Sequence, residues 1–163
     1  MKIELRSLIQ TSDFRVVSGG AIGVDILSHA ISVYENRPTV AILPSGLSNL
    51  YPSDFKRLAP ALLRSGGVIV SEFESTDAAH KHHFFYRNRL IAALGLVTVV
   101  VQAQERSGTF LTVHHALQNG KPVLVVPSHP QLSCFRGNQI LLQDGASPVY
   151  SGADIGLHLQ TEN

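Results

Sequence analysis

Residues 14–25 have the sequence Phe14-Arg15-Val16-Val17-Ser18-Gly19-Gly20-Ala21-Ile22-Gly23-Val24-Asp25. A short apolar run leads here into a glycine-rich turn and then into a helical pattern, which predicts a strand, a loop and a helix. The glycines let the chain turn tightly and bring backbone N–H groups close to an anion at the helix N-terminus. Gly19, Gly20 and Gly23 are therefore candidate anion-binding positions, although a plain structural turn is the alternative. A carboxylate near a first helical turn is stabilised there, so we expect Asp25 to hold the loop.

Similar runs rich in Val and Ile recur along the chain and alternate with helical patterns. Each run is apolar on both alternations, as in strands that are buried on both faces. Strands that alternate with covering helices indicate an α/β fold with a parallel sheet, in which ligands gather beyond the carboxyl ends of the strands. The predicted strands are 14–17, 39–43, 68–70, 97–101 and 123–126, and the predicted helices are 24–35, 53–65, 88–96 and 111–119.

Composition narrows the class of protein. The 163 residues are 44% hydrophobic and 15% charged, which fits one globular domain over 1–163, with a tail after about residue 154 that we expect to fray. The net charge of +1 requires any nucleic-acid site to be a local patch. No apolar run approaches the roughly 20 residues of a bilayer span, and the N-terminus lacks a signal-peptide pattern. The lone Cys134 fits a reducing compartment. We expect a cytoplasmic protein.

Residues 84–91 place two arginines and an asparagine directly behind three aromatic rings. Arginine offers a fixed fork of donors to phosphate, Asn88 can bond backbone or base edges, and an exposed ring stacks a base with roughly 1–3 kcal/mol. This combination suits a polyanion that carries flat bases. The alternative is that two of the rings belong to the core and that Arg87 and Arg89 pair with nearby acids.

A second small-residue turn, Arg106-Ser107-Gly108-Thr109, follows the fourth predicted strand. Its two hydroxyls, its backbone amides and the arginine could together grip one phosphate. The alternative is a simple capping motif with Ser107 or Thr109 at the N-cap of the next helix.

These motifs resemble the DNA-processing protein A (DprA/Smf) family of bacterial single-stranded-DNA-binding proteins. The matches follow the family's order along nearly the whole chain and comprise residues 17–25, 44–52, 70–72, 87–91, 107–109 and 137–138. The resemblance implies a Rossmann-like domain with a mostly parallel sheet and helices on both faces. It also implies sequence-nonspecific binding and protection of single-stranded DNA, homodimerisation, and loading of the recombinase RecA in natural transformation and recombination.

The resemblance assigns a phosphate contact to Lys81 and base stacking to Phe84, and places the glycine loop along the same pocket. No catalytic residue, cofactor or metal is expected. The candidate DNA- and phosphate-binding residues are Gly19, Gly20, Gly23, Lys81, Phe84, Arg87, Asn88, Arg89, Arg106, Ser107, Gly108 and Thr109.

Two departures from the family pattern bear on affinity. The family's domain begins with a further strand and a Gly-Ser/Thr-Arg loop, whereas this sequence starts in the helix that follows, so we expect an N-terminally incomplete domain. Many relatives carry arginine at the position of Ile22. Both departures predict weaker binding of DNA.

Histidines cluster at His80, His82 and His83, and again at His114 and His115. Adjacent residues on a helix point away from each other, so the second pair cannot easily face one ion. We expect the first cluster to face solvent and to add positive charge beside the DNA site below about pH 6.5.

Two other functional classes stay open. One is a phosphoribohydrolase-like enzyme that cleaves nucleotides, although no carboxylate follows Ser107-Gly108-Thr109 closely, as it does in those enzymes. The other is a nucleotide-sensing module.

For the expected homodimer, apolar side chains in 139–142 and 155–159 are candidate contacts without an obvious intramolecular partner.

Overall fold

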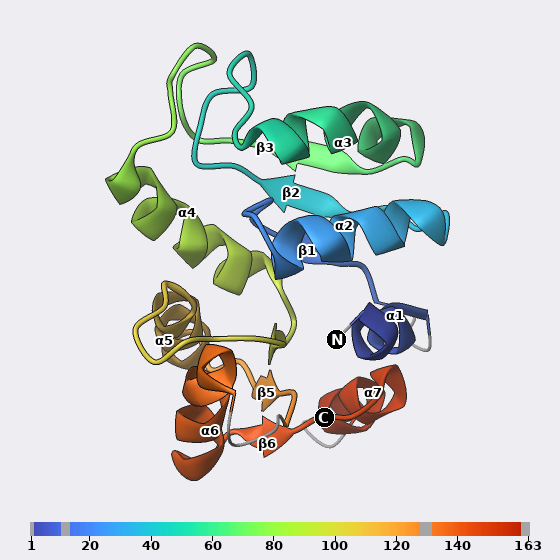
Figure 1. Cartoon of the computed structure of the whole chain (residues 1–163), viewed down its shortest axis with the longest axis vertical. Helices are drawn as coiled ribbons and strands as arrows, with labels where there is room; N and C mark the ends of the chain where they lie inside the picture. Colours follow the sequence, from blue (N-terminus) through green and yellow to red (C-terminus); the bar gives the residue numbers. More distant parts are fainter. Residues whose placement is uncertain (1, 11–13, 128–131, 161–163) are drawn as a thin grey trace. The chain divides into compact units, whose positions relative to one another are not determined.

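The computed structural model describes residues 2–10, 14–127 and 132–160. These residues form two compact units. The N-terminal sheet unit comprises residues 14–91, and the C-terminal sheet unit comprises residues 3–10 together with residues 92–160. Each unit contains a three-stranded parallel sheet (Figure 1).

In the N-terminal sheet unit the strands lie in the order β1-β2-β3. Val17 pairs with Val40, and Ala41 pairs with Ile69. Because all three strands run in the same direction, the loops that follow them leave from one edge of the sheet. The elements are β1 (Val17–Ser18), α2 (Val24–Tyr34), β2 (Val40–Ile42), α3 (Ser53–Arg64), β3 (Val68–Val70) and α4 (Lys81–Leu94).

The core of this unit forms where α3 packs onto the sheet. Phe55, Ala59 and Leu62 lie one turn apart on α3 and are buried against Ala41 and Leu43. This spacing is that of an amphipathic helix, which buries one stripe and leaves the opposite face to solvent. The burial fixes α3, and with it the loop that leads from β2 into its N-terminus.

The C-terminal sheet unit has the strand order β4-β5-β6, again all parallel. Its core is built from Val100, Val113, Ala116, Val125 and Leu141, which come from two strands and two helices. The elements are α1 (Lys2–Gln10), β4 (Thr98–Val100), α5 (Thr109–Gln118), β5 (Val123–Val125), the 3-10 turn η1 (Ser133–Phe135), α6 (Arg136–Gln143), β6 (Ser147–Pro148) and α7 (Gly152–Gln160).

The α/β class and the parallel pairing of the strands are confirmed. Four of the predicted strands are present, and the first, predicted at 14–17, is shorter and later, since β1 is Val17–Ser18. Burial on both faces holds for β5 but not for β3, where Val68 is half exposed because β3 lies at a sheet edge. A sixth strand, β6, and the helices α6 and α7 were not predicted. In the described part of the chain, no helix has the length and apolar character that crossing a membrane requires.

Two expectations about the late part of the chain change. The segment 139–142 does not offer an unpartnered apolar face, because Leu141 is buried and Leu142 packs against the core. Residues 152–160, part of which we expected to fray, form helix α7 with Ile155 buried and Leu157 exposed. Leu157 is the exposed residue among the described apolar side chains of 155–159, and the homodimer remains a prediction.

Candidate functional site

The glycine loop after β1 is held from inside by Asp25. Its carboxylate Oδ2 accepts hydrogen bonds from the backbone N–H of Gly19 at 3.1 Å and of Ala21 at 3.3 Å. Gly20 and Gly23 have positive φ values of 67° and 107°, a region that favours glycine. The predicted loop-holding role of Asp25 is confirmed. Two of the loop amides are therefore engaged by this carboxylate and are not offered to an outside anion.

Arg87 lies inside the same loop. Only 3% of its surface is exposed, and its Nη1 donates a hydrogen bond of 2.6 Å to the carbonyl oxygen of Ile42 at the end of β2. Burial lowers the pKa of Arg87, and the charge of Asp25 opposes that shift. The guanidinium thus ties the glycine loop to the neighbouring strand. A direct phosphate contact by Arg87 remains a prediction that requires the loop to open.

A neutral histidine lies beneath this loop. His29 is fully buried, and its Nδ1 lies 2.8 Å from the hydroxyl of Thr39, which itself donates to the carbonyl oxygen of Val16. Since that hydroxyl has its one proton in use, Nδ1–H of His29 is the donor. Burial lowers the pKa of His29 to about 4 against the opposing charge of Asp25, so the imidazole is neutral near pH 7.

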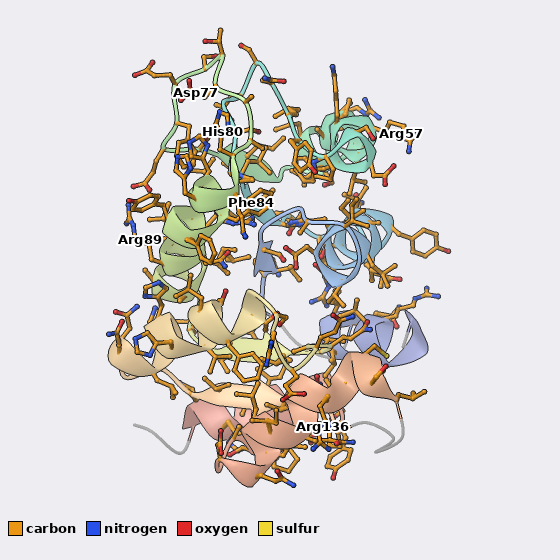
Figure 2. The ribbon with its side chains drawn as sticks, turned by 60° about the vertical axis from the view of Figure 1, so that its left-hand side comes forward. Arg57, Asp77, His80, Phe84, Arg89 and Arg136 are labelled. Atoms are coloured by element: carbon orange, nitrogen blue, oxygen red, sulfur yellow. The ribbon has the colours of Figure 1, made fainter. Side chains whose placement is uncertain are left out.

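Helix α4 presents two different faces. His83 and Arg87, one turn apart, are buried, whereas Lys81, Phe85 and Tyr86 are exposed. Figure 2 shows Phe84 and Arg89 projecting from this helix, with His80 just before its first turn. The sequence pattern predicts a helix only from residue 88, whereas α4 begins two turns earlier, at Lys81.

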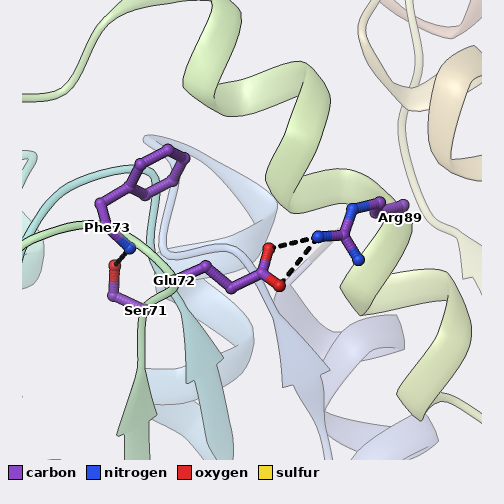
Figure 3. A network of polar contacts seen from close by, with 4 residues as sticks. All are labelled: Ser71, Glu72, Phe73 and Arg89. Atoms are coloured by element: carbon purple, nitrogen blue, oxygen red, sulfur yellow. Dashed lines mark hydrogen bonds and ion pairs between the residues drawn. The ribbon is translucent and has the colours of Figure 1, made fainter.

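Arg89 is exposed but paired. Its Nη2 donates to both carboxylate oxygens of Glu72 at 2.8 and 2.6 Å, the contact drawn in Figure 3. Nearby, the backbone N–H of Phe73 donates to the hydroxyl of Ser71 (Figure 3). The alternative that Arg89 pairs with a nearby acid is confirmed. A phosphate would have to compete with Glu72 for this guanidinium.

The expectation that the whole first histidine cluster faces solvent is wrong for His83. Its ring is 8% exposed, stacks on Phe73 at 3.8 Å between centroids, and donates from Nδ1 to the carbonyl oxygen of Pro44 at 3.0 Å. The reason is that α4 begins at Lys81, which turns His83 inward on the same face as Arg87. His80 and His82 are exposed. Among the described residues, no group of His, Cys, Asp and Glu could hold a metal ion.

An aromatic pair that sequence reasoning did not assign to the site joins the loop before α3 to helix α4. The rings of Tyr51 and Phe84 meet edge to face, with centroids 6.2 Å apart and planes at 88°. The guanidinium carbon of Arg87 lies 5.6 Å from the centroid of Phe84. Tyr51 is 48% exposed, whereas Phe84 is partly buried. Tyr51 stood in the matched segment 44–52, but nothing in the sequence brought it next to Phe84.

The second candidate loop lies in the C-terminal sheet unit. The hydroxyl of Ser107 accepts a hydrogen bond of 3.3 Å from the backbone N–H of Thr109, and Gly108 is the N-cap of α5. Ser107 therefore supports the helix start, in the manner of the capping alternative, although Gly108 takes the N-cap position. Arg106 is exposed.

Asn138 organises the chain just before that loop. It is fully buried, accepts from the backbone N–H of Ala103 at 2.8 Å, and donates to the carbonyl oxygens of Val101 and Val126 at 3.1 and 2.9 Å. Gly137 allows this approach, because a Cβ there would lie 2.7 Å from the carbonyl oxygen of Gln104. One side chain thus links the ends of β4 and β5.

A sequence profile of the DNA recombination-mediator protein A family matches residues 2–160. The chain belongs to this family. It is 34% identical over 149 residues to the DNA processing protein DprA of Bacillus subtilis, with 91% of this chain and 50% of that protein covered. It is 33% identical over 152 residues to protein Smf of Escherichia coli, with 93% of this chain and 41% of that protein covered. The chain thus spans about half the length of these relatives.

Solved structures of the family share the fold. DprA from Streptococcus pneumoniae aligns with a TM-score of 0.86 at 31% identity, covering 94% of this chain and 55% of that chain. DprA from Helicobacter pylori, described for its single-stranded DNA binding mode, aligns with a TM-score of 0.81 at 27% identity, covering 99% of this chain and 72% of that chain. These alignments establish the Rossmann-like fold of the family for this chain.

Within this family fold, the candidate residues divide between the two units. Their direct contact with DNA remains a prediction for each of them. The N-terminal sheet unit carries Gly19, Gly20, Gly23, Lys81, Phe84, Arg87, Asn88 and Arg89, and the C-terminal sheet unit carries Arg106, Ser107, Gly108 and Thr109.

Proposed function

We propose that this chain binds single-stranded DNA without regard to sequence, as part of DNA recombination or natural transformation. The main support is a cation beside two aromatic rings. Lys81 is exposed and lies one turn before Phe84 on α4, and the ring of Phe84 contacts that of Tyr51. All three residues follow the carboxyl ends of the strands. A cation beside aromatic rings is the arrangement that recognises phosphates and unpaired bases together. Membership of the family and the DNA-binding relative from Helicobacter pylori support the same function.

The residues divide into those that would touch DNA and those that position them. Lys81 and Arg106 are exposed cations for phosphate, and Thr109 offers a hydroxyl at the start of α5. Asp25 and Arg87 shape the glycine loop from within. Ile22, at the tip of that loop, is 74% exposed and contributes no charge, which fits binding weaker than in relatives that carry arginine there.

We propose binding rather than catalysis. Ser107-Gly108-Thr109 leads directly into the apolar start of α5, which has no acidic residue in its first turn. A phosphoribohydrolase of the kind considered above would carry a catalytic carboxylate close behind that loop. Handing of DNA to RecA and homodimerisation are parts of the same proposal and rest on the family. A cytoplasmic location, for which the lone Cys134 is weak support, also stays a proposal.

The test compares a fluorescent oligo-dT with a hairpin of equal length over a salt series, beside an assay for base release from a nucleoside monophosphate. We expect the oligo-dT to bind more tightly and no base to be released. Lys81→Gln should reduce the salt slope by about one unit, because one phosphate contact is lost. Arg64→Gln removes the same charge from the last turn of α3, at the far end of that helix from the site, and should leave the slope unchanged. Equal binding of both ligands, or equal slopes in both variants, would contradict the proposal.

A further inference from the structure

We propose that Tyr51, rather than Phe84, supplies the ring face on which an unpaired base stacks, with Phe84 acting as its support. This inference rests on the proposed binding of single-stranded DNA. It adds a base-contacting residue in the loop between β2 and α3, on a different element from the α4 residues considered so far.

The ring of Phe84 is already engaged by other side chains. One face of its ring lies under the guanidinium of Arg87, 5.6 Å from the centroid. That guanidinium is 3% exposed and fixed by its hydrogen bond to Ile42, so it does not readily withdraw. The ring of Tyr51 also lies against Phe84 at 88°, and Phe84 is the less exposed of the two rings. Stacking a base on Phe84 would require these contacts to break.

Tyr51, in contrast, is both exposed and held in place. Its ring is 48% exposed, and the loop that carries it is anchored on both sides. The backbone N–H of Gly46 donates to the carbonyl oxygen of Asp77 at 2.9 Å, and a Cβ on Gly46 would lie 2.0 Å from the carbonyl oxygen of Glu74. After Tyr51, the carbonyl oxygen of Pro52 accepts from the N–H of Lys56 in the first turn of α3. A ring held in this way loses little conformational freedom when a base stacks on it.

A positive charge lies near this ring pair. Lys81 is exposed and lies three residues before Phe84 on α4, which puts both on the same side of the helix. Because Phe84 touches Tyr51, a strand whose base stacks on Tyr51 brings its phosphates toward Lys81. The tyrosine ring supplies a large apolar face at low entropic cost, and its hydroxyl tolerates water.

The sequence contains no tryptophan, so a single substitution creates a clean fluorescent reporter. We would compare Tyr51→Trp with Tyr86→Trp, a matched control at a ring that is 60% exposed on the outer face of α4. Each variant is titrated with oligo-dT and with an abasic deoxyribose-phosphate oligomer of the same length. Quenching of the indole by oligo-dT, but not by the abasic oligomer, is expected for Tyr51→Trp alone. Equal quenching in both variants, or none, would overturn the proposal.

Affinity gives a second reading. Tyr51→Ala should weaken oligo-dT binding roughly 5- to 150-fold, the range for loss of one stacked base, and leave binding of the abasic oligomer unchanged. Tyr51→Phe, which keeps the ring, should recover most of that loss. If the parent chain binds both oligomers and Tyr51→Ala changes neither, this inference fails while DNA binding stands. If the parent chain binds neither oligomer, both proposals fail.

Discussion

Arg87 occupies the space that a side chain at Gly19 would need, with its Nη1 only 1.8 Å from the position of a Cβ on that glycine. The guanidinium therefore lies against the backbone of the glycine loop. Asp25 holds the same glycine from its amide. Glycine at this position allows the buried guanidinium to approach the backbone closely. The loop is therefore packed from inside and is not an open anion-binding site.

Gly19→Ala should destabilise the protein by about 1–3 kcal/mol, because the added methyl group forces Arg87 out of its buried position. Chemical denaturation followed by circular dichroism measures the change. Gly156→Ala in α7 is the matched control, because a Cβ there meets nothing within 4 Å. A control as destabilised as Gly19→Ala would show that the clash with Arg87 is not the cause.

The two arginines of α4 should respond differently to removal. Arg87→Ala leaves the carbonyl oxygen of Ile42 without its donor and Asp25 without a nearby cation. We therefore expect the free energy of unfolding to fall by about 2–4 kcal/mol and the affinity for DNA to fall as well. Arg89→Ala breaks only an exposed ion pair with Glu72, so its cost should stay below about 1 kcal/mol. Melting curves of both variants check this order. A larger loss in Arg89→Ala would reverse the assignment.

Asn138→Leu should destabilise the C-terminal sheet unit by about 1–3 kcal/mol, since the buried N–H of Ala103 loses its acceptor. DNA affinity should fall as well, because the loop that leads to Ser107 starts there. The exposed Gln118→Leu at the end of α5 is the control for a polar-to-apolar change. Unfolding of Asn138→Leu at the parent's denaturant midpoint would rule out this role.

Stability should depend on pH through His29. Burial lowers its folded pKa from 6.5 to about 4, so between these values the unfolded chain binds more protons than the folded one. The stabilisation is therefore complete above pH 6.5 and is lost as the pH falls toward 4, by up to about 3 kcal/mol at 1.36 kcal/mol for each pKa unit.

His29→Gln should flatten this part of the pH profile, whereas His82→Gln, at an exposed ring, should leave it unchanged. Denaturant midpoints measured from pH 7 to pH 4 provide the comparison, because this range spans the unfolded and folded pKa values of His29. An unchanged slope in His29→Gln would mean that other groups carry the acid sensitivity.

The features that local sequence could predict are those with local causes. The strands, the glycine turn and the role of Asp25 follow from β-branched runs, from glycine's freedom and from a carboxylate near a helix start. The start of α4 was missed because its inward face carries His83 and Arg87. Polar residues on the buried face remove the hydrophobic periodicity by which a helix is recognised.

Other features depended on contacts between distant residues. The ring pair of Tyr51 and Phe84 joins the loop after β2 to helix α4, and no spacing along the chain reveals it. The same holds for Asn138, whose partners lie on β4 and just after β5. β6 is only Ser147–Pro148, without the β-branched residues that mark a strand. The burial of Leu141 likewise depends on packing in the folded unit.

The central claim, that exposed cations and an exposed ring bind unpaired DNA, is tested most directly by comparing oligo-dT with a hairpin of equal length over a series of salt concentrations. We expect tighter binding of oligo-dT, with an affinity that falls linearly on logarithmic axes as salt rises. Equal affinity for the two ligands, or an affinity that does not change with salt, would contradict it.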